Sequence, residues 1–289
     1  MKKILLLAPL FAVSISFFYS CNSGSSGDTY TIKMRLNKGD TFNQDMDMNM
    51  HMTTAGIETN MRMSTGSSFQ VMNSDSAEKE LKITYTQMHV AMDMGKLNAM
   101  NNTPDSVLNK ANKNIIGKSV TIRMSKDNEI VNVSGFEELL NSEQGSDSAG
   151  RQMMKKMFSK DQFNSMFGLM FNMYPKKPVK VGESWNGDTK INMGGMNMDV
   201  KNKYTLLSVK NGMAEISIDG TLGGNGEILQ QSTGLKMDMS GSEKGTLQIR
   251  MDNGYLHSGS YKMDMKADMQ LMGQKIPMTM KADYTIKGI

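Results

Sequence analysis

The chain has 289 residues, and about 270 would remain after removal of an export signal, enough for one large domain or two small ones. Its formal net charge is only +4, and Lys2 and Lys3 of the signal supply part of it, so charge gives no support for nucleic-acid binding. A single cysteine excludes an intrachain disulfide, and 33 methionines are the one compositional extreme.

Residues 1–20 have the layout of a secretory signal peptide, with two lysines followed by a mostly apolar run over residues 4–18. That run is too short for a transmembrane helix, which needs roughly 20 residues. Ser20 precedes Cys21 as in a lipobox, so we expect cleavage before Cys21 and lipidation of its sulfur. Residues 21–27 then form a lipidated cysteine and a Ser/Gly-rich flexible tether. The alternative is a secreted protein whose cysteine is incidental.

Many methionines of the mature chain recur at every second position. Successive side chains of a β-strand point to opposite faces, so this period predicts half-buried strands with Met on one face and Asp, Asn, Lys or His on the other. Turn signals such as Asn211-Gly212 and Asn253-Gly254 separate the segments and favour antiparallel hairpins. The alternating segments are residues 45–52, 61–63, 88–94, 196–200, 237–239, 263–271 and 278–286.

The strand pattern occurs in two similar halves, residues 28–134 and 179–289. Gly39-Asp40-Thr41-Phe42 opens the first half, and Gly182-Glu183-Ser184-Trp185 opens the second. In each half a Met-rich strand pair is followed by Val/Ile/Leu strands and by a closing hairpin. The repetition predicts two related sets of antiparallel strands.

The central segment, residues 135–178, has a different period, because Met and Phe recur there at three and four, as in Met166 and Met170. This spacing predicts amphipathic helices that need an apolar surface to lie on. We therefore expect a single mainly β domain over residues 28–289. It would be a large curved antiparallel sheet or half-barrel of about ten to twelve strands, with the helical insert as a plug over its concave Met face.

The Met face has three interpretations. It is a filled core, because flexible methionine fills irregular gaps, or it is a pocket for a lipid or other apolar ligand, because so large a curved sheet has more apolar face than two helices cover. A Cu(I) site is a minor alternative, since thioethers select Cu(I) but neighbours on one strand lie about 6.6 Å apart. The candidate ligand-binding residues are Met46, Met48, Met50, Met52, Met166, Met170, Met196, Met198, Met263, Met265, Met278 and Met280.

Catalysis has no support in the sequence. No Ser/His/Asp arrangement, phosphate-binding Gly-rich loop or carboxylate pair stands out, and His51, His89 and His257 show no metal-ligand spacing. We therefore expect a protein that is not an enzyme and that has no cofactor and no metal site. Asp45 and Asp47 alternate with methionines and are expected on a solvated face.

Four short segments have a recognisable pattern: Tyr174 to Val181 with the Gly182-Glu183-Ser184-Trp185 that follows, Met272 to Met278, Gly117-Lys118-Ser119-Val120 and Ser134-Gly135-Phe136-Glu137. Together they resemble a family of uncharacterised bacterial envelope lipoproteins. The resemblance covers roughly residues 28–289, is structural in character and implies no catalytic residues. A curved sheet with a helical plug is also loosely similar to the half-barrels of lipoprotein-carrier proteins.

The expected role is that of a membrane-tethered lipoprotein that binds an apolar ligand. The lipid on Cys21 would hold it in the envelope, and the lack of an acidic run after Cys21 favours the outer membrane with the protein facing the periplasm. Its partners would be the membrane and a lipid or apolar small molecule, with no nucleic acid. The alternative is a structural or interaction module of the envelope with a filled Met-rich core.

Overall fold

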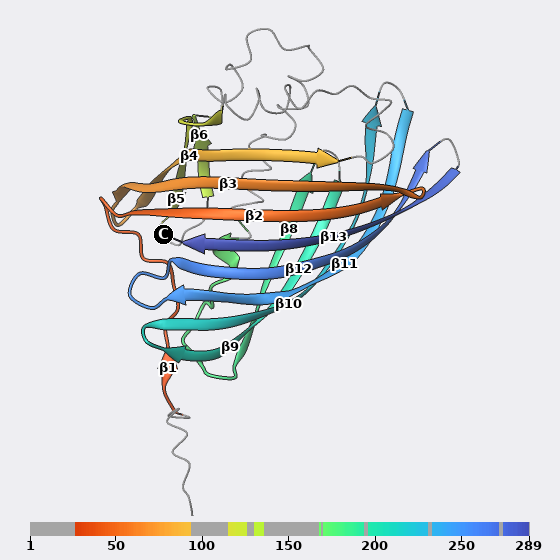
Figure 1. Cartoon of the computed structure of the whole chain (residues 1–289). Helices are drawn as coiled ribbons and strands as arrows, with labels where there is room; N and C mark the ends of the chain where they lie inside the picture. Colours follow the sequence, from red (N-terminus) through yellow and green to blue (C-terminus); the bar gives the residue numbers. More distant parts are fainter. Residues whose placement is uncertain are drawn as a thin grey trace, which may run out of the picture.

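One open sheet of eleven antiparallel strands makes up most of the described chain (Figure 1). A computed structural model describes residues 27–93, 115–125, 130–135, 168, 170–193, 196–230, 233–271 and 274–288. The strands are β1 Thr29–Tyr30, β2 Thr41–Thr54, β3 Ile57–Ser74, β4 Glu78–Asp93, β5 Ser119–Ser125, β6 Ile130–Ser134, β7 Val179–Lys180, β8 Ser184–Met193, β9 Met196–Lys210, β10 Met213–Gln230, β11 Thr233–Arg250, β12 Leu256–Leu271 and β13 Gln274–Gly288.

The expected fold class, a mainly β protein with one large curved antiparallel sheet, is confirmed. The order across the sheet is β6-β5-β4-β3-β2-β13-β12-β11-β10-β9-β8, and β1 pairs with β7 in a separate two-stranded sheet. The helical insert predicted for residues 135–178 lies largely outside the described residues, although residues 168 and 170–172 are helical. The hairpin turn predicted at Asn211-Gly212 is present, with φ of 51° and 75° at its two residues.

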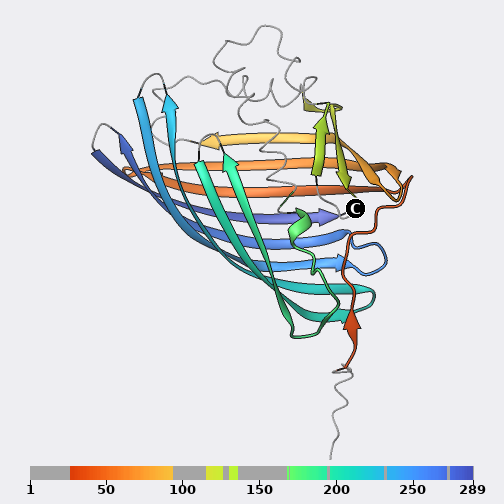
Figure 2. The ribbon, with the colours of Figure 1, turned by 180° about the vertical axis from the view of Figure 1, so that it is seen from behind.

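The sheet consists of two meanders joined along one seam. Strands β2 to β6 form one meander and β8 to β13 form the other, and β13 pairs with β2 so that Met280 lies opposite Met52. The pairing of β13 with β2 therefore joins the two meanders into one open sheet. The sheet curves strongly, and the segments that precede β2 and β8 lie on its concave side (Figures 1 and 2).

The same turn precedes β2 and β8. In the first turn, the Gly39 N–H donates to the Val71 carbonyl, and the Val71 N–H donates to the Asp40 carbonyl. In the second turn, the Gly182 N–H donates to the Leu206 carbonyl, and the Leu206 N–H donates to the Glu183 carbonyl. Both glycines have positive φ, 92° and 88°, a conformation that favours glycine over other residues. Each turn thus fixes where the following strand begins to pair.

Glycines on the concave face explain how the sheet curves. Gly245 shares its face with the buried Leu247, and a Cβ added there would collide with the backbone of Ser260 and with Tyr261 of the neighbouring strand. Large side chains therefore fold over neighbouring glycines, which lets strands approach on the inner side of the bend. Other inward glycines with such close neighbours are Gly187, Gly220, Gly224, Gly241 and Gly259.

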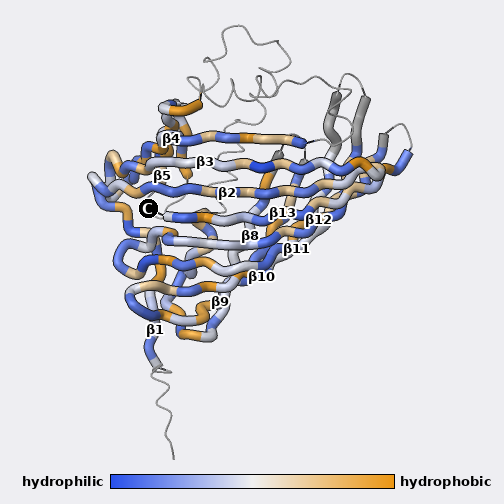
Figure 3. Tube along the Cα trace, in the orientation of Figure 1, coloured by the Kyte–Doolittle hydropathy of each residue, from blue (hydrophilic) through white to orange (hydrophobic). Residues whose placement is uncertain are grey.

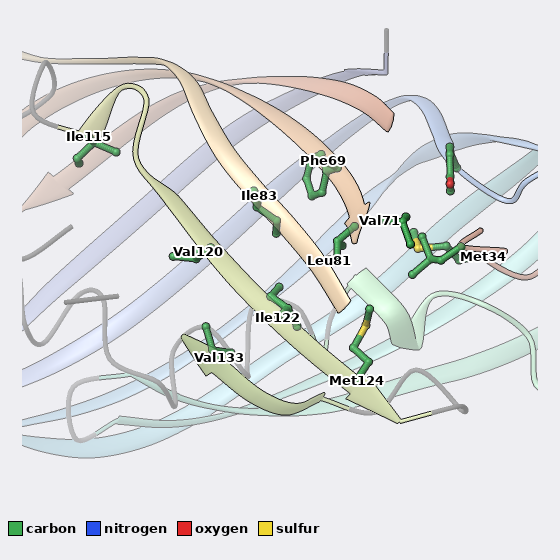
Figure 4. Close-up of a cluster of buried hydrophobic side chains, with 12 residues drawn as sticks. Met34, Phe69, Val71, Leu81, Ile83, Ile115, Val120, Ile122, Met124 and Val133 are labelled. Atoms are coloured by element: carbon green, nitrogen blue, oxygen red, sulfur yellow. The ribbon is translucent and has the colours of Figure 1, made fainter. Parts of the chain in front are cut away.

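Two apolar clusters fill one end of the concave side. The first is centred on Leu81 and Ile122 of the β2–β6 meander (Figure 4), and the second on Leu206 and Ile216 of the other meander. Residues 30–36, which precede β2 and for which the sequence analysis predicted no element, bury Ile32, Met34 and Leu36 in these clusters.

The chain between residues 170 and 179 packs over the same end of the sheet. The Tyr174 hydroxyl donates to the carbonyl of Gly254 at 2.7 Å, and Trp185 Nε1 donates to the carbonyl of Met173 at 2.9 Å. Trp185 also stacks on Tyr204, with ring centroids 5.9 Å apart. These contacts hold the segment against the inner face of β8, β9 and the β11–β12 turn.

The convex face is polar. Hydrophobic and hydrophilic residues alternate along the long strands (Figure 3), and the outward positions carry cross-strand ion pairs such as Lys262–Asp283 at 3.0 Å and Lys244–Asp219 at 3.6 Å. Exposed pairs of this kind contribute only about 0.2–1 kcal/mol each, so their main effect is to keep this face in water. Among the described residues, no helix has the length and apolar character needed to cross a membrane.

Candidate functional site: the concave methionine face

The strand register gathers methionines from several strands on the concave face. On β2, Met50 and Met52 point to the same side as the buried Met48. Met52 lies opposite Met280 of β13, which lies opposite Met265 of β12, so three methionines form one row across three strands. The period-two pattern therefore predicted the face correctly, and the pairing of strands assembles it into a surface.

The methionine surface continues across the second meander. Met278 of β13 and Met239 of β11 flank the buried Ala267 of β12, and Met198 of β9 packs against the same cluster. Met198 reaches there because its neighbour on β10 is Gly224, whose missing side chain leaves room for the Met198 Cγ. Small inward residues thus let thioethers from distant strands meet.

Most methionines of this face are only half buried. Met48 and Met265 are the exceptions among the candidates, with exposed fractions of 7% and 8%. Residues 30–36 and 170–179 cover the other end of the concave side, against the clusters of Leu81 and Leu206. An apolar surface therefore stays partly open to solvent. Its half-buried candidates are Met46, Met50, Met52, Met198, Met263, Met278 and Met280.

Some predicted site residues lie elsewhere or outside the described chain. Met170 packs against both core clusters at the filled end and is not part of the methionine rows. Met196 lies on β9 opposite Met193, but its side chain is outside the described part of the structure. Met166 and Cys21 are also outside the described residues.

Two buried polar side chains interrupt the apolar face. Asn202 of β9 and Glu243 of β11, with exposed fractions of 4% and 9%, flank Gly220 of β10. Asn202 Nδ2 donates to the Tyr204 hydroxyl at 3.2 Å, while Asn202 Oδ1 accepts no hydrogen bond in the described structure. Burial raises the pKa of Glu243, and the neighbouring Asn202 amide acts in the opposite direction.

Three tyrosines surround this carboxyl group. Tyr261 and Tyr284 stack with ring centroids 4.4 Å apart, and Tyr261 is the strand neighbour of Gly245, two residues along β11 from Glu243. Burial strongly raises the pKa of Tyr261, and Tyr284, Glu243 and Tyr204 raise it further. The pKa values of Tyr204 and Tyr284 are raised as well, mainly by burial and in part by Glu243. The hydroxyls and the carboxyl group thus share one poorly hydrated region.

The sequence analysis missed this polar group, although the period could have revealed it. Glu243 is in phase with Met237, Met239 and Leu247 on β11, and Asn202 is in phase with Val200 on β9. A charged residue at an apolar position of a strand is an informative exception, because buried ionisable groups are rare unless paired.

The structure offers no conventional metal centre in its described part. No group of three or more His, Cys, Asp or Glu residues there could hold a metal ion. His51 is exposed, with its Nδ1 2.8 Å from Asn60 Oδ1, on the face opposite to Met50 and Met52. It therefore cannot join the thioethers of β2 around one ion.

Fold and site define an open, curved antiparallel sheet with a polar convex face and an apolar concave face. A family profile matches residues 76–256, and the protein belongs to that family, which is described as a family of unknown function (DUF6263). The expected membership of an uncharacterised family is thereby confirmed. No curated protein sequence matches the chain.

The solved structures found by comparison share little sequence with the chain, and their TM-scores are below 0.5. One comes from a structure of lipid–protein interactions in lipovitellin. It shares 6% sequence identity at a TM-score of 0.46, over 88% of this chain and 25% of that one. The chain thus spans about a quarter of the lipovitellin chain. An outer membrane channel from Pseudomonas putida F1 shares 7% identity at a TM-score of 0.21, over 89% of this chain and 97% of the other.

Proposed function

We propose that this protein is a non-catalytic lipoprotein of the cell envelope that binds a lipid or another apolar ligand on its concave methionine face. The observation that carries the proposal is the partial exposure of methionines on β2, β13, β12 and β9, including Met50, Met52 and Met280. A ligand that covers these methionines gains about 25 cal/mol of binding free energy for every Å² of apolar surface removed from water.

The chemistry of the face suits an apolar ligand of variable shape. Methionine is unbranched and polarisable, so a methionine surface repacks around different partners. Contiguous exposed apolar patches are uncommon on soluble proteins and mark binding surfaces. The opposite face of the same strands carries exposed ion pairs such as Lys281–Asp264, so the apolar surface is confined to one side of the sheet.

Cys21 supplies the second part of the proposal. A lipid on this residue would hold the protein at a membrane, where lipids are the most abundant apolar ligands. The residues after Cys21 carry no acidic run, which favours the outer membrane with the protein facing the periplasm. Several acyl chains on one cysteine would anchor it firmly, whereas a single chain gives only marginal binding.

Titration with a dansyl-labelled fatty acid, below its micelle concentration, tests the binding proposal. The double variant M52Q/M280Q places two amides in the middle of the face, and we expect its affinity to fall at least tenfold. The control T53Q/T279Q changes the neighbouring pair of the same strands on the opposite face and should bind within twofold of the wild type.

The variant M52L/M280L keeps the face apolar and should retain binding. Circular dichroism establishes that each variant is folded. Folded wild-type protein that leaves the probe unbound would overturn the proposal, and so would equal affinity of M52Q/M280Q and the wild type. Native mass spectrometry of gently purified protein would then show whether a cellular lipid remains attached.

A second candidate is a structural or interaction module of the envelope with a filled core. Met48, Met237 and Met265 favour it, because each is at most 9% exposed and is therefore packed as a core residue is. This candidate predicts no affinity for the fatty acid and loss of stability in M52Q/M280Q. A Cu(I) site is the minor alternative, and a competition titration that finds no binding tighter than that of a methionine peptide excludes it.

A further inference from the structure

The concave face contains a buried acid that has no cationic partner among the described residues. Glu243 is 9% exposed, and the ion pairs of the described chain all lie among other residues. The cost of burying a carboxylate is high unless the charge is paired. A group that only supported the sheet would be better served by the Met or Leu that β11 places at the other inward positions.

Beside this acid lies a buried acceptor without a hydrogen bond. Asn202 Oδ1 is buried and accepts no hydrogen bond in the described structure, because the amide of Asn202 is oriented with its Nδ2 towards the Tyr204 hydroxyl. The amide oxygen extends over Gly220, where an added Cβ would meet both it and the Glu243 Cγ. Gly220 therefore brings the Glu243 carboxyl group and Asn202 Oδ1 close together; the Asn202 side chain hydrogen-bonds to Glu243, whereas Asn202 Oδ1 has no donor in the described structure.

The surroundings of the two acceptors favour a cation. Tyr204 lies next to Asn202 on the inner face of β9, and the stacked pair Tyr261–Tyr284 lies on the strands beyond β11. Aromatic faces attract ammonium groups, and more strongly where water is excluded. A carboxylate, an amide oxygen and tyrosine rings together form the chemistry of an ammonium site.

The acid also adjoins the methionine surface. Met263 of β12 is the direct strand neighbour of Glu243, and Met265 follows on the same face at the start of the row formed with Met280 and Met52. A ligand with its polar end at Glu243 would therefore lay an attached apolar chain over methionines. The polar cluster and the apolar surface have the arrangement of the two ends of one amphiphile.

We propose that Glu243 and Asn202 form the polar end of the ligand site and bind the primary ammonium head group of an amphiphile whose apolar chain lies on the methionine rows. This inference rests on the proposed function and assigns the ligand's chemical class. The ammonium group donates to the Glu243 carboxylate and to Asn202 Oδ1, which gives the buried acid a cationic partner and the amide oxygen a donor. Charge-assisted hydrogen bonds of this kind are about twice as strong as neutral ones.

Isothermal titration at pH 7.5 with three ligands of equal chain length tests the inference, with the two cations below their micelle concentrations and the alcohol below its solubility limit. Decylammonium has the charge and the N–H donors, decyltrimethylammonium has the charge alone, and 1-decanol is neutral. We expect wild-type protein to bind decylammonium at least tenfold more tightly than either of the others. In E243Q that preference should fall at least tenfold, while the affinity for 1-decanol stays within twofold.

The variant E215Q is the matched control, because Glu215 lies on the outward face of β10 and accepts a hydrogen bond from Ser208. It should keep the preference of the wild type. Equal binding of all three ligands by the wild type would overturn the ammonium inference and leave the proposed function standing. Equal binding of the two cations would also overturn it, because the hydrogen bonds to Asn202 would then have no part. Folded protein that binds none of the three would overturn the proposed function itself.

Discussion

Glu243 shows how one residue can oppose the pattern of its strand. Its position on β11 is inward, between Gly241 and Gly245, where the neighbouring inward residues are apolar or glycine. Burial raises the pKa of this carboxyl group above its ordinary value, so ionisation of Glu243 is less favourable in the folded protein than in the unfolded chain. The free energy of unfolding must then depend on pH through Glu243.

The sign of that dependence follows from proton binding. At a pH below the ordinary glutamate pKa both states are protonated, and Glu243 has no effect on the difference. As the pH rises towards the folded pKa, the unfolded chain ionises first and gains hydration, so the free energy of unfolding falls. The titratable groups that face Glu243 are Tyr204, Tyr261 and Tyr284, whose raised pKa values keep them neutral throughout.

We therefore expect E243Q to be more stable than the wild type at pH 8, by about 1 kcal/mol, and to lose this advantage near pH 4. Urea denaturation of both proteins between pH 4 and pH 8 measures the difference, which cancels the contributions of other acids. Acids with lowered pKa, such as Asp252, act in the opposite direction in both proteins. A difference that grows as the pH falls would contradict the assignment.

At the scale of elements, the period-two pattern was sufficient to predict most long strands. It identified β2, β12 and β13 directly, because methionines alternate there with charged residues over many positions. It also predicted that the described candidate methionines of β2, β12 and β13 share one face of the sheet. The pattern reports local geometry, so every strand that is long and amphipathic is visible to it.

The remaining elements depend on contacts that are distant in sequence. The pairing of β13 with β2 joins the two ends of the described body, and no local signal specifies it. Residues 30–36 alternate as a strand would, yet they lie across the concave side and form a core layer with residues 170–179. The polar pair Asn202–Glu243 was missed because polar residues were assigned to the solvated face by type and not by phase.

The turns before β2 and β8 provide a prediction at the same scale. The Asp40 carboxylate accepts hydrogen bonds from the Asn37 N–H at 3.0 Å and from the Tyr255 hydroxyl at 2.8 Å, whereas Glu183 accepts one from the Lys180 N–H at 2.8 Å. We expect D40A to lower the free energy of unfolding by about 2 kcal/mol, because it also leaves the buried Tyr255 hydroxyl without a partner, and E183A by about 0.5–1 kcal/mol.

Urea denaturation at pH 7 measures both changes. The hydrogen bond from Asn37 is the main cause of the lowered pKa of Asp40, with Tyr255 contributing and burial opposing. The contribution of Asp40 is therefore present above its unfolded pKa, and the D40A effect should shrink as the pH falls through the folded pKa. Equal losses in D40A and E183A would mean that the Tyr255 contact adds nothing.

At the scale of the whole molecule, the two ends of the concave side have different roles. One end is filled by side chains from four directions, the two meanders and the segments 30–36 and 170–179. The other end carries the partly exposed methionines on long strands that extend past the core. A sheet that is rigid at one end and open at the other provides a stable frame for an adaptable apolar surface.

The proposed lipid anchor on Cys21 would hold the sheet at a membrane. In C21S the sulfur that would carry the lipid is replaced by a hydroxyl, so we expect the membrane-associated fraction to fall more than tenfold, and the protein to appear in the soluble periplasmic fraction. Fractionation of cells followed by immunoblotting measures the shift. The matched control S23A changes a neighbouring residue of the tether and should stay with the membrane.

Because the described body begins after Cys21, the purified C21S protein should keep the wild-type free energy of unfolding and the wild-type affinity for the dansyl-labelled fatty acid. Membrane association of C21S equal to that of the wild type would refute the anchor while leaving the binding face to be tested by itself.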